Sequence, residues 1–152
     1  MADPAMLPCS DKTSTPDVPA NVIELPGRPE SAALARTFAR EALGDRHPAA
    51  DDVTLLVSEL TANAVIHSRS RDGGTVTLMI ADRVTHVHIE VTDEGGDAAP
   101  ELREDPLSEG GRGLMLVNLI SHRWGVSQDW SWRTVWCEVR YEIATTPAGG
   151  RV

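Results

Sequence analysis

The chain has 152 residues, of which 41% are hydrophobic and only 4% aromatic, and its formal net charge at pH 7 is −9. A single domain of this length can bury a core, which must be mostly aliphatic here. The negative charge argues against a protein that binds nucleic acid through its phosphates, since such a protein needs a surplus of Lys and Arg. A small phosphate site remains compatible with the charge, because backbone amides can bind an anion.

The composition also predicts where the protein works. No apolar run approaches the roughly 20 residues of a membrane-spanning helix. Residues 1–12 lack the basic start and the apolar centre of a signal peptide. Cys9 and Cys137 have no metal-binding spacing. We therefore expect a cytoplasmic protein in which both thiols are reduced.

The first elements in chain order are a tail, a strand and a helix. Residues 1–20 are expected to be a disordered tail, because four prolines stand there among small and polar residues. Residues 21–26 (NVIELP) predict a short edge strand that ends at its proline. A helix is predicted over residues 29–43, with Ser31 as its cap and apolar side chains along one face.

Residues 49–68 predict the central helix. On this helix Glu59 and Asn63 are neighbours one turn apart. A carboxylate there can accept a proton from a hydroxyl that attacks a phosphate, and an amide oxygen can ligate Mg²⁺. A solvated polar helix edge is the alternative interpretation. The apolar residues recur at steps of three and four, which is typical of an amphipathic helix: they are Val53, Leu56, Val57, Leu60 and Ala64.

Residues 75–81 and 86–92 predict a β-hairpin that turns at residues 82–83. Its second strand leads directly into Asp93 and Gly95. A carboxylate at a strand end, followed by glycines, can accept a hydrogen bond from an exocyclic amine such as N6 of adenine. A plain turn has the same composition, so this segment alone is a weak indication of function.

His86 and His88 stand two residues apart and therefore on one face of the second predicted strand. Two histidines on one face suggest a metal site. No third ligand stands at a useful spacing, so surface histidines without a metal are the favoured interpretation.

Residues 97–109 are polar and are interpreted as a lid over a nucleotide, or as a plain surface loop. Gly111 and Gly113 then lead into a helix predicted over residues 113–121. Backbone N–H groups at a glycine-rich helix start form an anion site suited to polyphosphate. The alternative is that these glycines only shape a loop.

Two strands, residues 124–128 and 133–143, are predicted to end the domain, with a turn at residues 129–132. Residues 144–152 are expected to form a flexible tail, so the predicted domain spans residues 21–143. Core packing and turn anchoring are expected for most tryptophans of this hairpin, and a partner-docking surface is the alternative. The tryptophans are Trp124, Trp130, Trp132 and Trp136.

Three segments follow one another in a specific order: E-L-T-x-N-A-x-x-H, then D-x-G, then G-x-G-L. In this order and spacing they resemble the N, G1 and G2 boxes of the GHKL ATPase superfamily, which includes gyrase, Hsp90, histidine kinases and MutL. The small size, the short connection between the last two boxes and the ending RWGV…TVW are most similar to the anti-sigma-factor serine kinases. The resemblance covers residues 25–139.

The resemblance implies a Bergerat-type GHKL fold, which is an α/β (α+β) two-layer sandwich. Its helices cover one face of a mixed, mostly antiparallel sheet, and ATP with Mg²⁺ lies between the helices and the sheet. Position by position, the resemblance implies a catalytic role for Glu59 and a magnesium-binding role for Asn63. Asp93 matches the aspartate that binds adenine. The implied glycines, one beside adenine and two at the phosphates, are Gly95, Gly111 and Gly113.

Two positions depart from the family pattern. The fuller G1 box has another glycine two residues after Gly95, where this chain has Asp97. The hairpin position usually held by glycine in a G-K-T-V-W ending is Trp132, and Arg133 follows it. A bulky ring in that turn predicts a longer or reshaped hairpin loop.

The implied function is that of an ATP- and Mg²⁺-dependent serine protein kinase that regulates transcription as an anti-sigma factor does. It would phosphorylate a serine on an anti-anti-sigma (STAS-type) partner and bind a sigma factor. Direct contact with nucleic acid or membrane is not expected, and a homodimer stays open.

Two alternative functions remain. The first is a nucleotide-binding regulatory module that controls its partner by binding without phosphorylating it, and the retained Glu59 argues against this alternative. The second is the ATPase portion of a histidine kinase. No helical segment ahead of the N box carries a phosphoaccepting histidine, which disfavours this second alternative.

Overall fold

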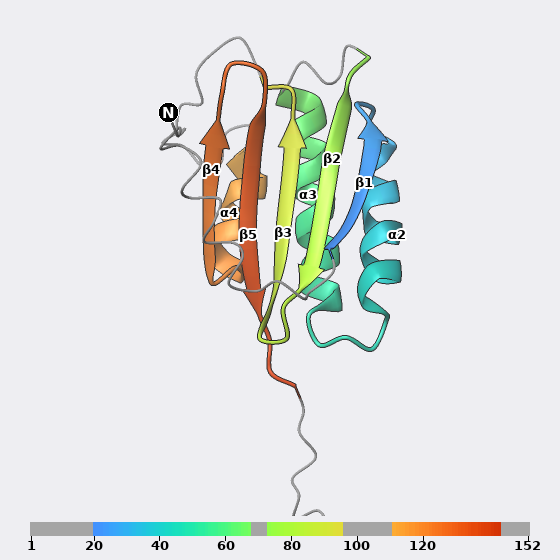
Figure 1. The fold of residues 1–152 in the computed structure, drawn as a ribbon, viewed down its shortest axis with the longest axis vertical. Helices are drawn as coiled ribbons and strands as arrows, with labels where there is room; N and C mark the ends of the chain where they lie inside the picture. The colour runs from blue at the N-terminus through green and yellow to red at the C-terminus, as the bar shows by residue number, and fades with distance from the viewer. Residues whose placement is uncertain (1–19, 68–72, 96–110, 144–152) are drawn as a thin grey trace, which may run out of the picture.

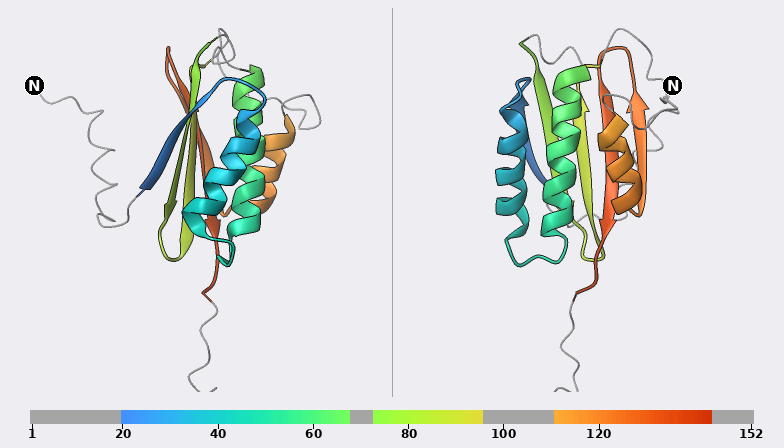
Figure 2. Two further views of the ribbon diagram at one scale, coloured as in Figure 1. Left: turned by 90° about the vertical axis from the view of Figure 1, so that its right-hand side faces the viewer. Right: turned by 180° about the vertical axis from the view of Figure 1, so that it is seen from behind.

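The structure, a computed structural model, describes residues 20–67, 73–95 and 111–143. The predicted lid and most of both predicted tails lie outside these ranges. The described residues form two layers, with a five-stranded sheet in front and three helices behind it in Figure 1. The two views of Figure 2 show all three helices on the same face of the sheet. The predicted two-layer α/β (α+β) class is therefore confirmed.

The elements follow the predicted order along the chain. The sheet order is β1-β2-β3-β5-β4, and every neighbouring pair of strands is antiparallel. The predicted mixed sheet is thus fully antiparallel in the described residues. The elements are β1 (Ala20–Pro26), α2 (Ser31–Leu43), α3 (Ala50–His67), β2 (Thr75–Asp82), β3 (His86–Asp93), α4 (Gly111–Ile120), β4 (Arg123–Gln128) and β5 (Arg133–Arg140).

The core lies between α3 and the helix-facing side of the sheet. α3 is the middle helix of the layer, between α2 and α4 (Figure 2). Burying one aliphatic side chain of this size contributes about 1.5–3 kcal/mol, so the apolar stripe decides which side of α3 meets the sheet. All five predicted stripe residues are buried: Val53, Leu56, Val57, Leu60 and Ala64. Alternate strand residues cover them, among them Leu78, Ile80, Val87, Ile89, Val91, Cys137 and Val139.

The predicted capping role of Ser31 is wrong. Ser31 is the first residue of α2 and is buried, while Glu30 occupies the cap position without a side-chain hydrogen bond to the helix. The Ser31 hydroxyl donates instead to the backbone carbonyl of Pro26 at the end of β1. The hydroxyl therefore ties the helix to the preceding strand, a partner that helix-cap rules do not consider.

Three side chains at one end of the sheet form hydrogen bonds with one another, and we call them the Asp82 cluster: Asp82, His47 and Tyr141. His47 Nδ1 accepts the N–H of Ala49 at 3.0 Å, so the ring proton is on Nε2, which donates to Asp82 Oδ2 at 2.8 Å. The Tyr141 hydroxyl and the Val84 N–H both donate to Asp82 Oδ1. The cluster joins the α2–α3 connection, the β2–β3 turn and the segment after β5.

The electrostatics of the Asp82 cluster follow from these contacts. Burial by itself would raise the pKa of Asp82, but the hydrogen bonds from Tyr141, Val84 and His47 outweigh it and lower that pKa. Burial, together with the Asp82 carboxylate, raises the pKa of Tyr141 to about 12.

Within the described part of the chain, no helix combines the length and the apolar composition that crossing a membrane requires.

Candidate functional site

Glu59 and Asn63 lie on the flank of α3 that is turned toward α4. Ser58 accepts a hydrogen bond from Arg36 of α2 at 2.7 Å, which shows the flank that faces α2. Successive helical residues are rotated by about 100°, so Glu59 and Asn63 are turned away from α2. Both residues are half-buried, and α4 packs beside α3 on this side (Figure 2). The structure therefore brings together a carboxylate and an amide facing a second helix, while their roles stay predictions.

Gly111 and Gly113 lie in the first turn of α4. This turn starts at the end of the sheet where β3 ends and β5 begins (Figure 1). The first backbone N–H groups of a helix have no partner within the helix, and the helix dipole favours an anion there. The phosphate-binding role of the glycines stays a prediction, and the position of the helix start is compatible with it.

Asp93 is the last residue of β3, and its side chain is only 2% exposed. Oδ1 accepts the backbone N–H of Gly95 at 2.7 Å, and Oδ2 accepts a hydrogen bond from Arg133 Nη2 at 3.0 Å. An ionised carboxylate has about four acceptor positions, so these two donors leave acceptor capacity for a ligand. The predicted base-binding aspartate thus has a cationic partner that sequence patterns did not predict.

A row of three polar residues crosses the sheet at this end. Asp93 pairs with Arg133 of β5, and Arg133 pairs with Gln128 of β4. Two residues earlier on β3, Val91 pairs with Val135, and both belong to the core. Strand side chains alternate between the two faces of a sheet, so all three polar residues share the helix-facing side. We call Asp93, Arg133 and Gln128 the Asp93 row.

The Asp93 row holds two buried atoms that have no hydrogen-bond partner among the described residues. They are Arg133 Nε, a donor, and Gln128 Oε1, an acceptor. Burial raises the pKa of Asp93, and the Arg133 charge and the Gly95 N–H partly offset the rise. Buried polar atoms usually have partners, so this end of the sheet is equipped to bind a polar ligand.

Gly95 has a φ of +70°, a conformation that costs other residues about 1–2 kcal/mol. A Cβ at this position would stand 3.7 Å from the backbone of Trp132, which is an ordinary contact. Glycine is therefore favoured by the backbone conformation, which aims the Gly95 N–H at Asp93. Asp97, the departure from the G1 pattern, lies outside the described residues.

Sequence patterns missed Arg133 and Gln128 as members of the site. The alternation of β5 offered a signal, because Val135, Cys137 and Val139 face the helices and Arg133 continues that series. The alternation did not show that Arg133 contacts Asp93. Only the pairing of β5 with β3 places Arg133 beside Asp93.

The hairpin of β4 and β5 distributes its tryptophans differently from the prediction. Its loop is closed by the Asp129 N–H, which donates to the Trp132 carbonyl at 2.9 Å. Trp124 packs against the core, as expected. Trp136 lies on the outer face, where His88 stacks on it with centroids 5.9 Å apart. The side chains in the loop are open to solvent, with Trp130 94% and Trp132 38% exposed.

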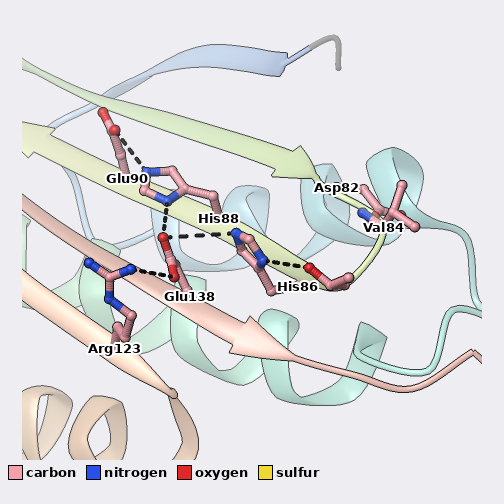
Figure 3. A network of polar contacts seen from close by, with 8 residues as sticks. Asp82, Val84, His86, His88, Glu90, Arg123 and Glu138 are labelled. Carbon is pink, nitrogen blue, oxygen red and sulfur yellow. Dashed lines mark hydrogen bonds and ion pairs between the residues drawn. The ribbon is translucent and has the colours of Figure 1, made fainter. Parts of the chain in front are cut away.

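His86 and His88 belong to a polar network on the outer face of the sheet (Figure 3). His88 contacts Glu90 at 2.9 Å and Glu138 at 3.6 Å, and His86 lies 3.8 Å from the same Glu138. Arg123 also reaches Glu138, at 3.9 Å. Among the described residues, no group of three or more His, Cys, Asp or Glu side chains has an arrangement that could hold a metal ion. The carboxylates of Glu90 and Glu138 are the charged partners of the two histidines.

Comparison with protein families decides the class to which this fold and site belong. Residues 25–135, more than half of the chain, match the family model described as the histidine kinase-like ATPase domain. The chain belongs to this family. Membership confirms the predicted GHKL-type superfamily and makes the chain an ATP-binding domain of the ATPase or kinase type. A comparison with curated proteins gives no significant match.

The residues of this histidine kinase-like ATPase domain fit ATP. The Asp93 row offers a buried carboxylate with spare acceptor capacity and an unpartnered guanidinium donor, which suit the polar edge of a base. The first turn of α4 offers backbone N–H groups to phosphates. Glu59 and Asn63 face that helix from α3. The three parts come from segments that are distant in the chain: β3 with β5, α4 and α3.

Proposed function

We propose that this chain is an ATP- and Mg²⁺-dependent serine protein kinase that acts as an anti-sigma-factor-like regulator. It phosphorylates a serine on an anti-anti-sigma (STAS-type) partner and also binds a sigma factor, which it withholds from transcription. The observation that carries the proposal is the position of Glu59, a half-buried carboxylate on the flank of α3 turned toward α4. A passive nucleotide-binding module has no need of a carboxylate at this place.

Glu59 is assigned the role of general base. Its carboxylate accepts the proton of the serine hydroxyl while the serine oxygen bonds to the γ-phosphorus of ATP. The bond from that phosphorus to the bridging oxygen breaks, and ADP leaves. Phosphoryl transfer depends mainly on position and charge stabilisation, so an in-line arrangement of the phosphates is the main requirement.

Asn63 is assigned to Mg²⁺. Its amide oxygen is a hard ligand, one helical turn from Glu59, and Mg²⁺ in nucleotide enzymes is commonly bound by one or two protein oxygens together with phosphates and water. The donor set around α3 fits this shared mode of binding. When bound, the ion supplies positive charge that stabilises the phosphates of ATP.

The choice of partner rests on the resemblance to anti-sigma-factor kinases. Its support within the chain is the pattern of the three boxes, the short segment between the last two boxes and the RWGV…TVW ending. The family match to a histidine kinase-like ATPase domain supports the use of ATP and is neutral on the identity of the partner.

The test compares the parent protein with Glu59→Gln, which keeps the shape of the side chain but cannot accept a proton. Proteins captured from the host lysate on each variant are incubated with and without ATP, and their intact masses are measured. We expect Glu59→Gln to bind ATP and the partner normally and to lose phosphoryl transfer by roughly 10²-fold or more. Glu41→Gln, an exposed position on α2, is the matched control and should transfer normally.

Two results would contradict the proposal. Unchanged transfer by Glu59→Gln would remove Glu59 as the base. A parent protein that binds ATP and the partner but never adds a phosphoryl group would favour the nucleotide-binding regulatory module instead.

A further inference from the structure

We propose that Arg133 is a specificity-determining residue of the ATP site and donates a hydrogen bond to the ring nitrogen N1 of adenine. The neighbouring N6 amine of adenine donates a hydrogen bond to Asp93. The inference rests on the proposed use of ATP and deepens it, because it names a second group that contacts the base.

The position of Arg133 is the first observation. It is the first residue of β5, and the β3–β5 register places it directly opposite Asp93 on the helix-facing side. Its side chain is 22% exposed, and Nη2 donates to Asp93 Oδ2 at 3.0 Å. The guanidinium is therefore held at the carboxylate that is assigned to the base.

The unused donor is the second observation. Arg133 Nε is buried and has no hydrogen-bond partner among the described residues. In the planar guanidinium only Cζ separates Nε from Nη2, so the Nε–H lies next to the Asp93 contact. A buried donor without a partner is costly, and a ligand acceptor that reaches it removes that cost.

Asp93 and Arg133 together present an acceptor next to a donor. The edge of adenine presents the matching pair, since the N6 amine is a donor and the adjacent N1 is an acceptor. Guanine presents the reverse pair at the same positions, because O6 is an acceptor and N1–H is a donor. Asp93 would then face O6, and the Arg133 donor would face N1–H. Arg133 thus adds a second point of discrimination to that of Asp93.

The experiment measures the affinity of the full chain for ATP and for 1-deaza-ATP, in which a C–H group replaces N1. The variants are Arg133→Met and Arg140→Met. Arg140 is an exposed residue on the same strand whose side chain is on the outer face, opposite His86, so its substitution removes the same charge. The ratio of the two affinities cancels the general attraction of arginine for phosphates, because both ligands carry the same triphosphate.

We expect the parent to bind ATP about ten- to a hundredfold more tightly than 1-deaza-ATP, the range for a hydrogen bond to a charged group. Arg133→Met should bind both ligands equally, and Arg140→Met should keep the parent ratio. If Arg133→Met fails to fold, Arg133→Lys keeps a cation beside Asp93 without the planar fork. Its ratio should also fall toward one.

Three results would overturn the inference. If the parent binds both ligands equally, the protein makes no hydrogen bond to N1. If Arg133→Met, or Arg133→Lys in its place, keeps the affinity ratio of the parent, another group makes the hydrogen bond to N1. An Arg133→Met protein that binds ATP more tightly than the parent shows that the guanidinium competes with the base for Asp93. Failure of the parent to bind ATP at all would remove the proposed function as well, whereas these three results leave ATP binding intact.

Discussion

Asp82 and Asp93 are the last residues of two neighbouring strands, and they lie at opposite ends of the sheet because β2 and β3 are antiparallel. The Asp82 side chain is 39% exposed and receives hydrogen bonds from His47, Tyr141 and Val84. The Asp93 side chain is 2% exposed and receives hydrogen bonds from Gly95 and Arg133.

The two environments shift the acid pKa in opposite directions. Three donors outweigh burial at Asp82 and lower its pKa, whereas burial outweighs two donors at Asp93 and raises its pKa. The number of protein donors and the burial therefore distinguish a structural aspartate from one that can bind a ligand. An acid with many protein donors joins segments of the chain, and a buried acid with fewer donors keeps acceptor capacity for a ligand.

The largest expected effect comes from Asp93→Asn. The substitution removes the charge that accepts from the base and introduces an amide that can donate, so ATP affinity should fall by about a hundredfold or more. Isothermal calorimetry measures this change. Asp82→Asn is the matched control and should bind ATP like the parent. Equal losses in both variants would mean that Asp93 acts through the stability of the fold and not through the base.

Asp82→Asn should instead lower the free energy of unfolding, by about 1–3 kcal/mol. The cluster loses a charged acceptor that joins His47 and Tyr141, and partial exposure of Asp82 moderates the cost. Urea denaturation measures the change. Asp45→Asn serves as the control because its contact with Arg40 is exposed, and its effect should stay within about 1 kcal/mol. A stability equal to that of the parent would show that the Asp82 cluster is not a stabilising junction.

Two glycine substitutions separate backbone strain from ligand binding. Gly95 and Gly44 have φ angles of +70° and +88°, and neither has a close neighbour at the position of a Cβ. Gly95→Ala and Gly44→Ala should each lower the free energy of unfolding by about 1–2 kcal/mol. Only Gly95→Ala should also weaken ATP binding, because the Gly95 N–H positions Asp93. ATP binding that is equally weakened by Gly44→Ala would contradict this local role.

As the pH is lowered, ATP affinity should fall before the free energy of unfolding does, because the pKa of Asp93 is raised and the pKa of Asp82 is lowered. Protonation of Asp93 removes its negative charge and turns one of its acceptor oxygens into an O–H donor. Its contribution to ATP affinity therefore weakens as the pH falls through its raised pKa. The stability contributed by Asp82 is present above its ordinary pKa of 3.8 and is lost only as the pH falls through its lowered pKa. Titration of ATP affinity and of the free energy of unfolding should therefore show that binding weakens first. Asp93→Asn should lack this acid loss of binding, and an unchanged acid loss would assign it to another group.

The smallest expected effect concerns alkaline pH and Tyr141. Its pKa is raised to about 12, so the stability that its proton contributes is present below the unfolded value of about 10. This stability is lost as the pH rises toward the folded value. Tyr141→Phe should lower the free energy of unfolding by about 1 kcal/mol at neutral pH and should remove this alkaline loss. Chemical denaturation at neutral and alkaline pH tests it, and an identical alkaline loss in both proteins would contradict the assignment.

The sequence by itself determined the local elements and the positions of the matched site residues on them. The apolar stripe from Val53 to Ala64 predicted α3 and its buried side, because helical periodicity is a property of nearby residues. The strand that ends at Asp93 and the glycines in the first turn of α4 were likewise local patterns. The order of the three boxes predicted the superfamily, which the family match confirms.

Only the tertiary structure decided which side chains these residues meet. Arg133 lies forty positions after Asp93, and the register of β5 on β3 brings the two together. His47 meets Asp82 through a contact that is similarly distant in the chain, and Ser31 binds the Pro26 carbonyl instead of capping α2. Periodicity and capping rules concern residues within a few positions of one another. Partners across a sheet depend on strand order and register, which are set by packing of the whole domain.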